Sequence, residues 1–256
     1  MSVKMRIVVI GGTGLIGAKT VALLKNAGHD VVAASTRTGI NALTGEGLES
    51  ALEGAQVVID TSNIMSFDLA EVKHFFETSS TNLLNAEKKA GVRHHVVLSI
   101  VGVQALAANP YLAGKVVQED VVKRSGQPYT IVRATQFHEF ISTLVDAYTV
   151  DGVARVPDIM FQPIAADDVA AALVVAALSQ PINETVDIAG PELKPLSTFI
   201  SKYLEAHGDK RDVVADPSIG YFGAPVSEKS LVPSGEVRVG TTTLASSLST
   251  ANEKVA

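Results

Sequence analysis

The stretch RIVVIGGTGLIGAKT, residues 6–20, places four apolar residues directly before a cluster of glycines. A strand that passes into a helix through Gly11, Gly14 and Gly17 is the context of a dinucleotide-binding turn. The first glycine permits a tight turn, the second lets a diphosphate approach the backbone, and the third lets the helix pack against the sheet. The alternative is a glycine-rich turn that binds nothing. The predicted site comprises Gly11, Thr13, Gly14, Leu15, Ile16 and Gly17.

Short apolar runs alternate with helical stretches along the next hundred residues. DVVAAS, QVVID, HHVVLSIVG and PYTIVRAT are the expected strands after the first. Runs without strict polar alternation, interleaved with helices, indicate a parallel sheet that is buried on both faces. We therefore predict an α/β fold, a Rossmann-type doubly wound parallel sheet. Residues 1–150 would form the nucleotide-binding domain, which also takes in elements of residues 165–190, and residues 151–256 a smaller C-terminal substrate-binding portion.

Two helix starts can be predicted from capping residues. Asn109 and Pro110 are expected as the N-cap and first residue of a helix that ends before Gly126. Ser66 is expected to cap the long helix that ends near Gly91.

Composition excludes several classes of function. The 256 residues carry a formal charge of −6, which gives no general attraction to nucleic acid or to anionic lipid. The chain has no cysteine, so disulfides, thiolate catalysis and cysteine metal sites are excluded, and a reducing cytoplasm is the expected location. Its longest apolar run is far shorter than the ~20 residues that span a bilayer. We expect no nucleic-acid partner and no membrane insertion.

Residues 33–39, AASTRTG, follow the second expected strand and contain no carboxylate. A site for the coenzyme that lacks a 2′-phosphate usually has an acidic residue here, which accepts from the ribose hydroxyls. Ser35, Thr36, Arg37 and Thr38 instead offer a cation among hydroxyls, which suits a 2′-phosphate. The segment favours NADPH over NADH, although Arg37 could also be an ordinary solvated arginine.

Tyr111 and Lys115 are four residues apart on one side of a predicted helix. Reduction of a carbonyl leaves an alkoxide that needs a proton, and a phenol of pKa ~10 is a weak donor unless a cation stabilises its phenolate. Lys115 could be that cation and could also bind the nicotinamide ribose, while Ser99 could orient the substrate oxygen. An amphipathic tyrosine and a solvated lysine are the alternative interpretation.

These features together resemble the atypical short-chain dehydrogenase/reductases, specifically the NmrA-like, NAD(P)-binding branch. The matching stretches are GGTGLIG, NLLNAEKKAGVRHHVVLSIVG, the Tyr111–Lys115 pair, SGQPYTIVRATQFHEF and QPIAADDVAAAL. The resemblance implies that Thr61, Ser62 and Asn63 line the path of the adenosine and ribose. It also implies that Ala134, Thr135, Gln136 and Phe137 lie near the nicotinamide, with most of the substrate pocket coming from later segments.

The leading hypothesis is an NADPH-dependent oxidoreductase that transfers hydride to a small carbonyl or quinone-like substrate. A regulatory protein that binds NADP(H) without turnover is the main alternative, and a sugar-nucleotide epimerase or dehydratase is a third. His138 is a candidate for substrate binding, whereas His94 and His95 are expected at the surface. No residues form a metal set. A homodimer is left open.

Overall fold

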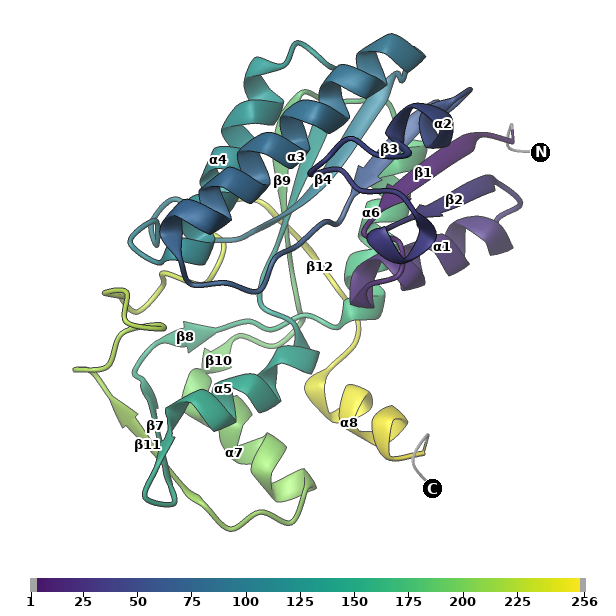
Figure 1. Cartoon of the computed structure of the whole chain (residues 1–256). Helices are drawn as coiled ribbons and strands as arrows, with labels where there is room; N and C mark the ends of the chain where they lie inside the picture. The colour runs from purple at the N-terminus through teal and green to yellow at the C-terminus, as the bar shows by residue number, and fades with distance from the viewer. Residues whose placement is uncertain (1–3, 254–256) are drawn as a thin grey trace.

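Seven parallel strands form the central sheet of the computed structural model, which describes residues 4–253 and side chains up to residue 250 (Figure 1). In order across the sheet they are β12 (Val237–Val239), β9 (Glu184–Ala189), β5 (Tyr129–Ala134), β4 (His94–Ile100), β3 (Val57–Asp60), β1 (Arg6–Ile10) and β2 (Asp30–Ala34). Every pairing among them is parallel. Ile7, Val8 and Val9 of β1 are fully buried because helices cover both faces. The predicted Rossmann-type fold is confirmed.

Five helices flank this sheet in two layers (Figure 1). They are α1 (Leu15–Asn26), α2 (Leu48–Leu52), α3 (Leu69–Ala90), α4 (Pro110–Arg124) and α6 (Ala166–Leu178). Apolar side chains of α1 and α6 pack together against one face. Side chains of α2, α3 and α4 form the core against the other face.

A smaller portion lies beyond the carboxyl ends of the strands (Figure 1). It comprises η2 (His138–Phe140), α5 (Ile141–Tyr148), β6 (Thr149–Val150), β7 (Val153–Pro157), β8 (Met160–Phe161), β10 (Lys194–Pro195), α7 (Leu196–Ala206), β11 (Asp212–Asp216) and α8 (Leu244–Glu253). The strands β11, β7 and β6 make a three-stranded sheet, and β8 pairs with β10. Phe161, Phe199 and Ile200 are buried in the separate core of this portion.

The chain crosses between the two portions more than once. After the first elements of the small portion it returns to the large sheet as α6 and β9, and much later as β12. Residues 237–239 therefore belong to the large sheet, although they follow the small portion's elements in the sequence. The predicted division assigns to that sheet only elements of residues 165–190 from the second half.

The helix that carries Tyr111 begins as predicted. Asn109 is the N-cap of α4, its Oδ1 accepts from the amides of Tyr111 at 3.0 Å and Leu112 at 3.2 Å, and Pro110 follows as the first residue. The long helix α3 ends at Gly91 as predicted, but its predicted N-cap is wrong.

Asp68 rather than Ser66 is the N-cap of α3, since its Oδ1 accepts from the amide of Glu71 at 2.8 Å. Ser66 supports this cap from outside the helix: its hydroxyl accepts from the amide of Asp68 and donates to the Glu71 carboxylate.

Candidate active site

The glycine turn between β1 and α1 brings the backbone close to the loop after β3. Gly11 has a φ of +74°, and a Cβ there would lie 2.7 Å from the carbonyl oxygen of Thr61. A Cβ on Gly17 would overlap the carbonyl oxygen of Gly11. At Gly14 a Cβ would meet only the Gly11 oxygen at 3.3 Å, so its other side faces free space. Two glycines thus serve packing, and the third leaves room for a ligand.

The start of α1 is prepared for an anion. Gly14 is the N-cap, and no side chain in residues 4–250 caps the helix. The first turn also contains no acidic residue. Amides at a helix start lack partners within the helix, and the helix dipole favours negative charge there. This end of α1 therefore suits a diphosphate.

A cavity of about 480 Å³ extends from the glycine turn to the small portion. Most of the predicted site residues line it: Gly11, Gly14, Leu15, Ile16, Gly17, Thr61, Ser62, Asn63, Ser99, Tyr111, Lys115, Ala134, Thr135, Gln136 and Phe137. Because the strands are parallel, the ends of β1, β3, β4 and β5 all meet at this edge of the sheet. Thr13, the segment Ser35–Thr38 and His138 do not line the cavity.

Several buried polar atoms at this edge have no hydrogen-bond partner among the described residues. They are the hydroxyls of Ser35, Ser62 and Thr135 and the side-chain oxygen of Gln136. A buried polar atom without a partner costs free energy, so such atoms mark positions where a ligand can supply the missing bond. Their grouping fits a long polar ligand such as a nicotinamide dinucleotide.

The segment Ser35–Thr38 follows β2, beside the glycine turn. The amide of Gly12 donates to the carbonyl of Ala34 at 3.1 Å, which ties the two loops together. Ser35 donates its amide to Thr38 Oγ1 at 2.9 Å, which closes the short helix η1 (Thr36–Thr38). Arg37 is exposed and forms no ion pair within residues 4–250. Its guanidinium is therefore available to an anion.

Tyr111 lies in the first turn of α4 and is half-buried at the cavity wall. Its hydroxyl donates to Asn63 Oδ1 at 2.9 Å. Burial raises the pKa of Tyr111 to about 12, and the bond to Asn63 offsets only part of that rise. The phenol is thus neutral at pH 7 and a weaker acid than free tyrosine, so proton donation requires a cation that stabilises its phenolate.

Lys115 is one turn further along α4 and is 4% exposed. Its Nζ donates to the carbonyl of Leu98 at 2.6 Å and to the side-chain oxygen of Gln118. The ring of Phe76 lies beneath the ammonium, with its centroid at 4.8 Å. Burial lowers the pKa of Lys115 to about 8, although the charge of Asp60 favours the protonated form.

Ser99, at the end of β4, donates its hydroxyl to Glu119 Oε1 at 2.6 Å. Arg133 Nε donates to the same oxygen at 2.8 Å, and Lys123 donates to Oε2 at 3.0 Å. Burial alone would raise the pKa of Glu119, but the bonds from Arg133 and Ser99 outweigh it and hold the pKa below its usual range. The hydroxyl proton of Ser99 is therefore directed to a structural carboxylate behind the cavity.

The histidines differ from their expected environments. His138 is 5% exposed and bonds through Nδ1 to Ser247 Oγ at 2.7 Å and through Nε2 to the carbonyl of Pro163. The expectation that His94 and His95 lie at the surface is wrong, because both are buried. His95 Nδ1 lies 2.8 Å from Glu87 Oε1, a partner on α3 that strand periodicity could not reveal. No cluster of three metal-ligating side chains occurs among the described residues.

The cavity also has an apolar wall that the sequence did not indicate. It is formed by Ile64, Met65, Phe67, Leu112, Phe140, Tyr221 and Phe222. Phe222 is at the centre of an aromatic cluster, with ring centroids 6.0 Å from Phe67 and 6.1 Å from Phe140. Its φ of +47° is rare for a residue with a bulky side chain. The glycines around Phe222 in GYFGAP indicate a turn in the sequence, but they do not indicate that this turn lies at the cavity.

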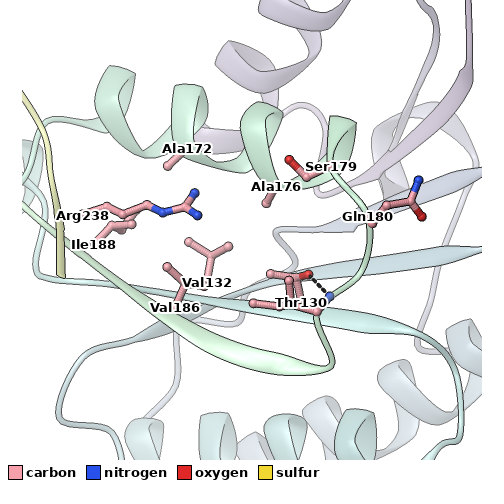
Figure 2. Close-up of a pocket in the computed structure, with 10 residues that line it drawn as sticks. Thr130, Val132, Ala172, Ala176, Ser179, Gln180, Val186, Ile188 and Arg238 are labelled. Atoms are coloured by element: carbon pink, nitrogen blue, oxygen red, sulfur yellow. Dashed lines mark hydrogen bonds between the residues drawn. The ribbon is translucent and has the colours of Figure 1, made fainter. Parts of the chain in front are cut away.

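A second, much smaller cavity lies between α6 and the sheet (Figure 2). Arg238 of β12 reaches into the space between them, and Thr130 Oγ1 accepts from the amide of Ile182 at 3.5 Å (Figure 2). Its volume of about 40 Å³ suffices for a water molecule and not for a coenzyme. The large cavity is therefore the candidate active site.

The fold and the cavity define a protein that binds a nicotinamide dinucleotide at the carboxyl edge of a Rossmann-type sheet. Residues 11–181 match the family described as NAD(P)H-binding. The chain belongs to that family, in agreement with the resemblance to the NmrA-like, NAD(P)-binding branch of the atypical short-chain dehydrogenase/reductases. No helix within residues 4–253 has both the length and the apolar character required to cross a membrane.

The curated relatives are similar to part of the chain. Photosystem II assembly factor Ycf39 of Synechocystis sp. is 28% identical over 160 residues, which cover 57% of this chain and 48% of that protein. The protein of the same name from Cyanophora paradoxa is 29% identical over 149 residues, with coverage of 53% and 46%. The chain thus spans about half the length of these relatives.

The solved structures are similar along nearly the whole chain. MoeE5 in complex with UDP-glucose and NAD aligns with a TM-score of 0.72 and 18% identity, covering 98% of this chain and 100% of that one. A short-chain dehydrogenase/reductase superfamily protein from Agrobacterium tumefaciens with bound NAD gives 0.70, 17% identity and 98% of both chains. UDP-glucose 4-epimerase from Thermotoga maritima gives 0.69 and 16% identity, covering 98% and 100%. At these identities the similarity establishes the shared fold.

Proposed function

We propose that the protein is an NADPH-dependent reductase of a small carbonyl or quinone-like substrate. One observation carries the proposal: Tyr111 and Lys115 line the same cavity as the glycine turn and the apolar wall. A proton donor, a cation and an apolar substrate compartment therefore lie along one space.

Each part of the site has a role in binding the coenzyme. The amides at the start of α1 would hold the diphosphate, and Arg37 with its neighbouring hydroxyls would hold the 2′-phosphate. Thr61 and Ser62 would line the adenosine and ribose. The Thr135 hydroxyl and the Gln136 side-chain oxygen, which have no partner within residues 4–250, would bind near the nicotinamide. When bound, the reduced nicotinamide supplies a hydride to an electrophilic carbon.

Tyr111 would supply the matching proton. Its hydroxyl now donates to Asn63, and a substrate oxygen in that position would accept the same hydrogen bond. As charge develops on that oxygen, the proton passes from the phenol to it, and the resulting phenolate needs a nearby cation. Lys115 would provide that cation and would bind the nicotinamide ribose.

The apolar wall favours a flat substrate with little polar surface. Phe140, Tyr221 and Phe222 line the cavity and pack in the core of the small portion. Aromatic rings pack well against planar conjugated molecules. Quinone-like compounds and aromatic aldehydes fit such a wall better than a sugar would.

A regulatory protein that binds NADP(H) without turnover is the second candidate. The bonds of Ser99 to Glu119 and of Lys115 to Leu98 favour it, because both polar groups are already satisfied within the protein. Similarity to proteins named as assembly factors points the same way.

A substrate screen separates the two candidates. NADPH oxidation would be followed with a panel of quinones and aldehydes, and coenzyme binding would be measured in parallel by NADPH fluorescence. Binding together with turnover supports the reductase. Tight binding without turnover on any compound contradicts the reductase and supports the regulatory protein. The chain has no tryptophan, so protein fluorescence interferes little.

A further inference from the structure

We propose that Asp60 and Gln118 are positioning residues that hold Lys115 at the cavity wall and keep it cationic. They form a hydrogen-bonded series that runs from the end of β3 to the side chain of Lys115. The inference rests on the proposed function, in which Lys115 acts as a cation, but it can be tested without turnover.

The series is buried and continuous. Asp60 is 2% exposed and its Oδ2 accepts from Gln118 Nε2 at 2.9 Å. Gln118 is 1% exposed and accepts from Lys115 Nζ through its Oε1. Nζ also donates to the carbonyl of Leu98 at 2.6 Å, so two acceptors fix the ammonium.

The chemistry at both ends fixes the orientation of the Gln118 amide. An ammonium can only donate and a carboxylate can only accept, so the amide oxygen must face Lys115 and the amide nitrogen must face Asp60. The amide dipole then points its negative end at the cation. The negative charge of Asp60 polarises the uncharged Gln118 amide, and the polarised amide stabilises the positive charge of Lys115.

The surroundings leave Asp60 as the main counter-charge. Glu119 is the other carboxylate near Lys115, but Arg133 of β5 and Lys123 of α4 already pair with it. Tyr111, on the same helix, is neutral. From α3 the Phe76 ring faces the ammonium, and β4 contributes the Leu98 carbonyl.

A buried pair, His95 of β4 and Glu87 of α3, lies behind Asp60. Burial raises the pKa of Glu87, whereas the burial that would lower the pKa of His95 is outweighed by the Glu87 carboxylate. The negative charge of Asp60 adds a smaller rise to the pKa of both.

Asp60 also connects the series to the predicted coenzyme loop. Its other oxygen, Oδ1, accepts from the amide of Ser62 at 2.8 Å. One carboxylate therefore orients both the loop that would line the ribose and the lysine that would bind it.

The charge of Lys115 can be titrated directly in the full-length, coenzyme-free protein. With lysine labelled by ¹³C at Cε, its signal is assigned by its loss in Lys115→Arg. The wild-type midpoint is expected near 8, the pKa to which burial lowers this lysine. Gln118→Leu and Asp60→Asn should lower the midpoint by about one unit, because the first removes an acceptor of the ammonium and the second removes the favourable charge. In the double variant Asp60→Asn/Gln118→Glu the midpoint should rise again by about as much, since a single carboxylate then faces the ammonium directly.

A matched variant and a second measurement complete the test. Gln127→Leu removes a partly buried glutamine outside this series, which bonds to the Val92 carbonyl, and should leave the midpoint unchanged. If neither single variant lowers the midpoint, or if the double variant Asp60→Asn/Gln118→Glu stays as low as Asp60→Asn, the proposal is overturned. Both changes in the double variant preserve side-chain shape. With a substrate in hand, the fall of kcat at high pH should shift in the same directions. Failure to find turnover would contradict the proposed reductase. The titration would still decide whether Asp60 and Gln118 keep Lys115 cationic.

Discussion

The two ends of the cavity differ in how far the protein satisfies its own polar groups. At the coenzyme end, the start of α1 has no capping side chain, and the hydroxyls of Ser62 and Thr135 have no partner among the described residues. At the other end, which contains the side chains proposed for catalysis, Ser99, Tyr111 and Lys115 all donate to protein acceptors. The first end is complete only with a ligand. The second must exchange at least one hydrogen bond before it can act on a substrate.

This contrast separates binding from chemistry. A protein could keep the coenzyme end and lose turnover without any change in its fold, because the side chains proposed for catalysis are already satisfied by internal bonds. Substitutions at the two ends should therefore affect different quantities, and the following measurements test whether they do.

Tyr111→Phe should have the largest effect, and it should lower turnover without weakening coenzyme binding. Removal of the proton donor is expected to lower kcat by about 10²- to 10⁴-fold, the range typical of general acid catalysis. The affinity for NADPH should remain within a factor of about two, since the phenol hydroxyl bonds to the Asn63 side chain and to no residue of the glycine turn. Stopped-flow turnover and fluorescence titration measure the two quantities. Undiminished kcat would remove Tyr111 as the acid.

Gly14→Val should weaken coenzyme binding without disrupting the fold. A Cβ at Gly14 meets only the Gly11 oxygen at 3.3 Å, so the fold should tolerate it while the side chain fills the space for the diphosphate. The affinity for NADPH is expected to fall about 100-fold, or about 2.7 kcal/mol. Asn26→Val, at the exposed far end of α1, is the control. Equal affinity in Gly14→Val and the control would mean that the coenzyme does not approach this turn.

Arg37→Ala should test which residue at the coenzyme end distinguishes NADPH from NADH. Loss of a charged contact to the 2′-phosphate is expected to weaken NADPH binding about 10-fold and to leave NADH binding unchanged. Arg124→Ala is a matched control, because Arg124 is exposed at the end of α4 and bonds only to a backbone carbonyl. Equal losses for both coenzymes would assign Arg37 no part in discrimination.

Ser99→Ala should have the smallest effect, on stability rather than on turnover. Glu119 would lose one donor and keep Arg133 and Lys123, at a cost of about 1 kcal/mol in the free energy of unfolding. Urea unfolding measures this, with Ser179→Ala as the control at an exposed hydroxyl. A large loss of turnover at unchanged stability would instead place Ser99 in contact with the substrate.

The fold and the outline of the coenzyme end were predictable because their signals are local. Three glycines at fixed spacing, a preceding apolar run and the cap at Asn109 each act over a few residues. Parallel strands then bring their carboxyl ends to one edge of the sheet. Residues after β3 and β5 therefore line the same cavity as the glycine turn, and this could be predicted without knowing any contact between distant residues.

The remaining features depend on contacts between distant residues. Phe67 and Phe222 are brought together only by the folding of two irregular loops, and no periodicity marks either one. The partners of Ser99 and His95 come from helices 20 and 8 residues away, and they decide whether each side chain faces the cavity or the core. Likewise Ser66 and Asp68 are both good caps by type, and the bond to the Glu71 amide distinguishes them.

The pairing of β12 with β9 bears on how a newly made chain acquires its structure. Six strands of the large sheet leave the ribosome by residue 189, whereas the seventh, Val237–Val239, emerges about fifty residues later. Throughout that interval the outer edge of β9 has no neighbour, and unpaired strand edges are where nascent polypeptides associate wrongly. Slow translation between these points would prolong that exposure, so the yield of folded protein should depend on codon choice there more than elsewhere.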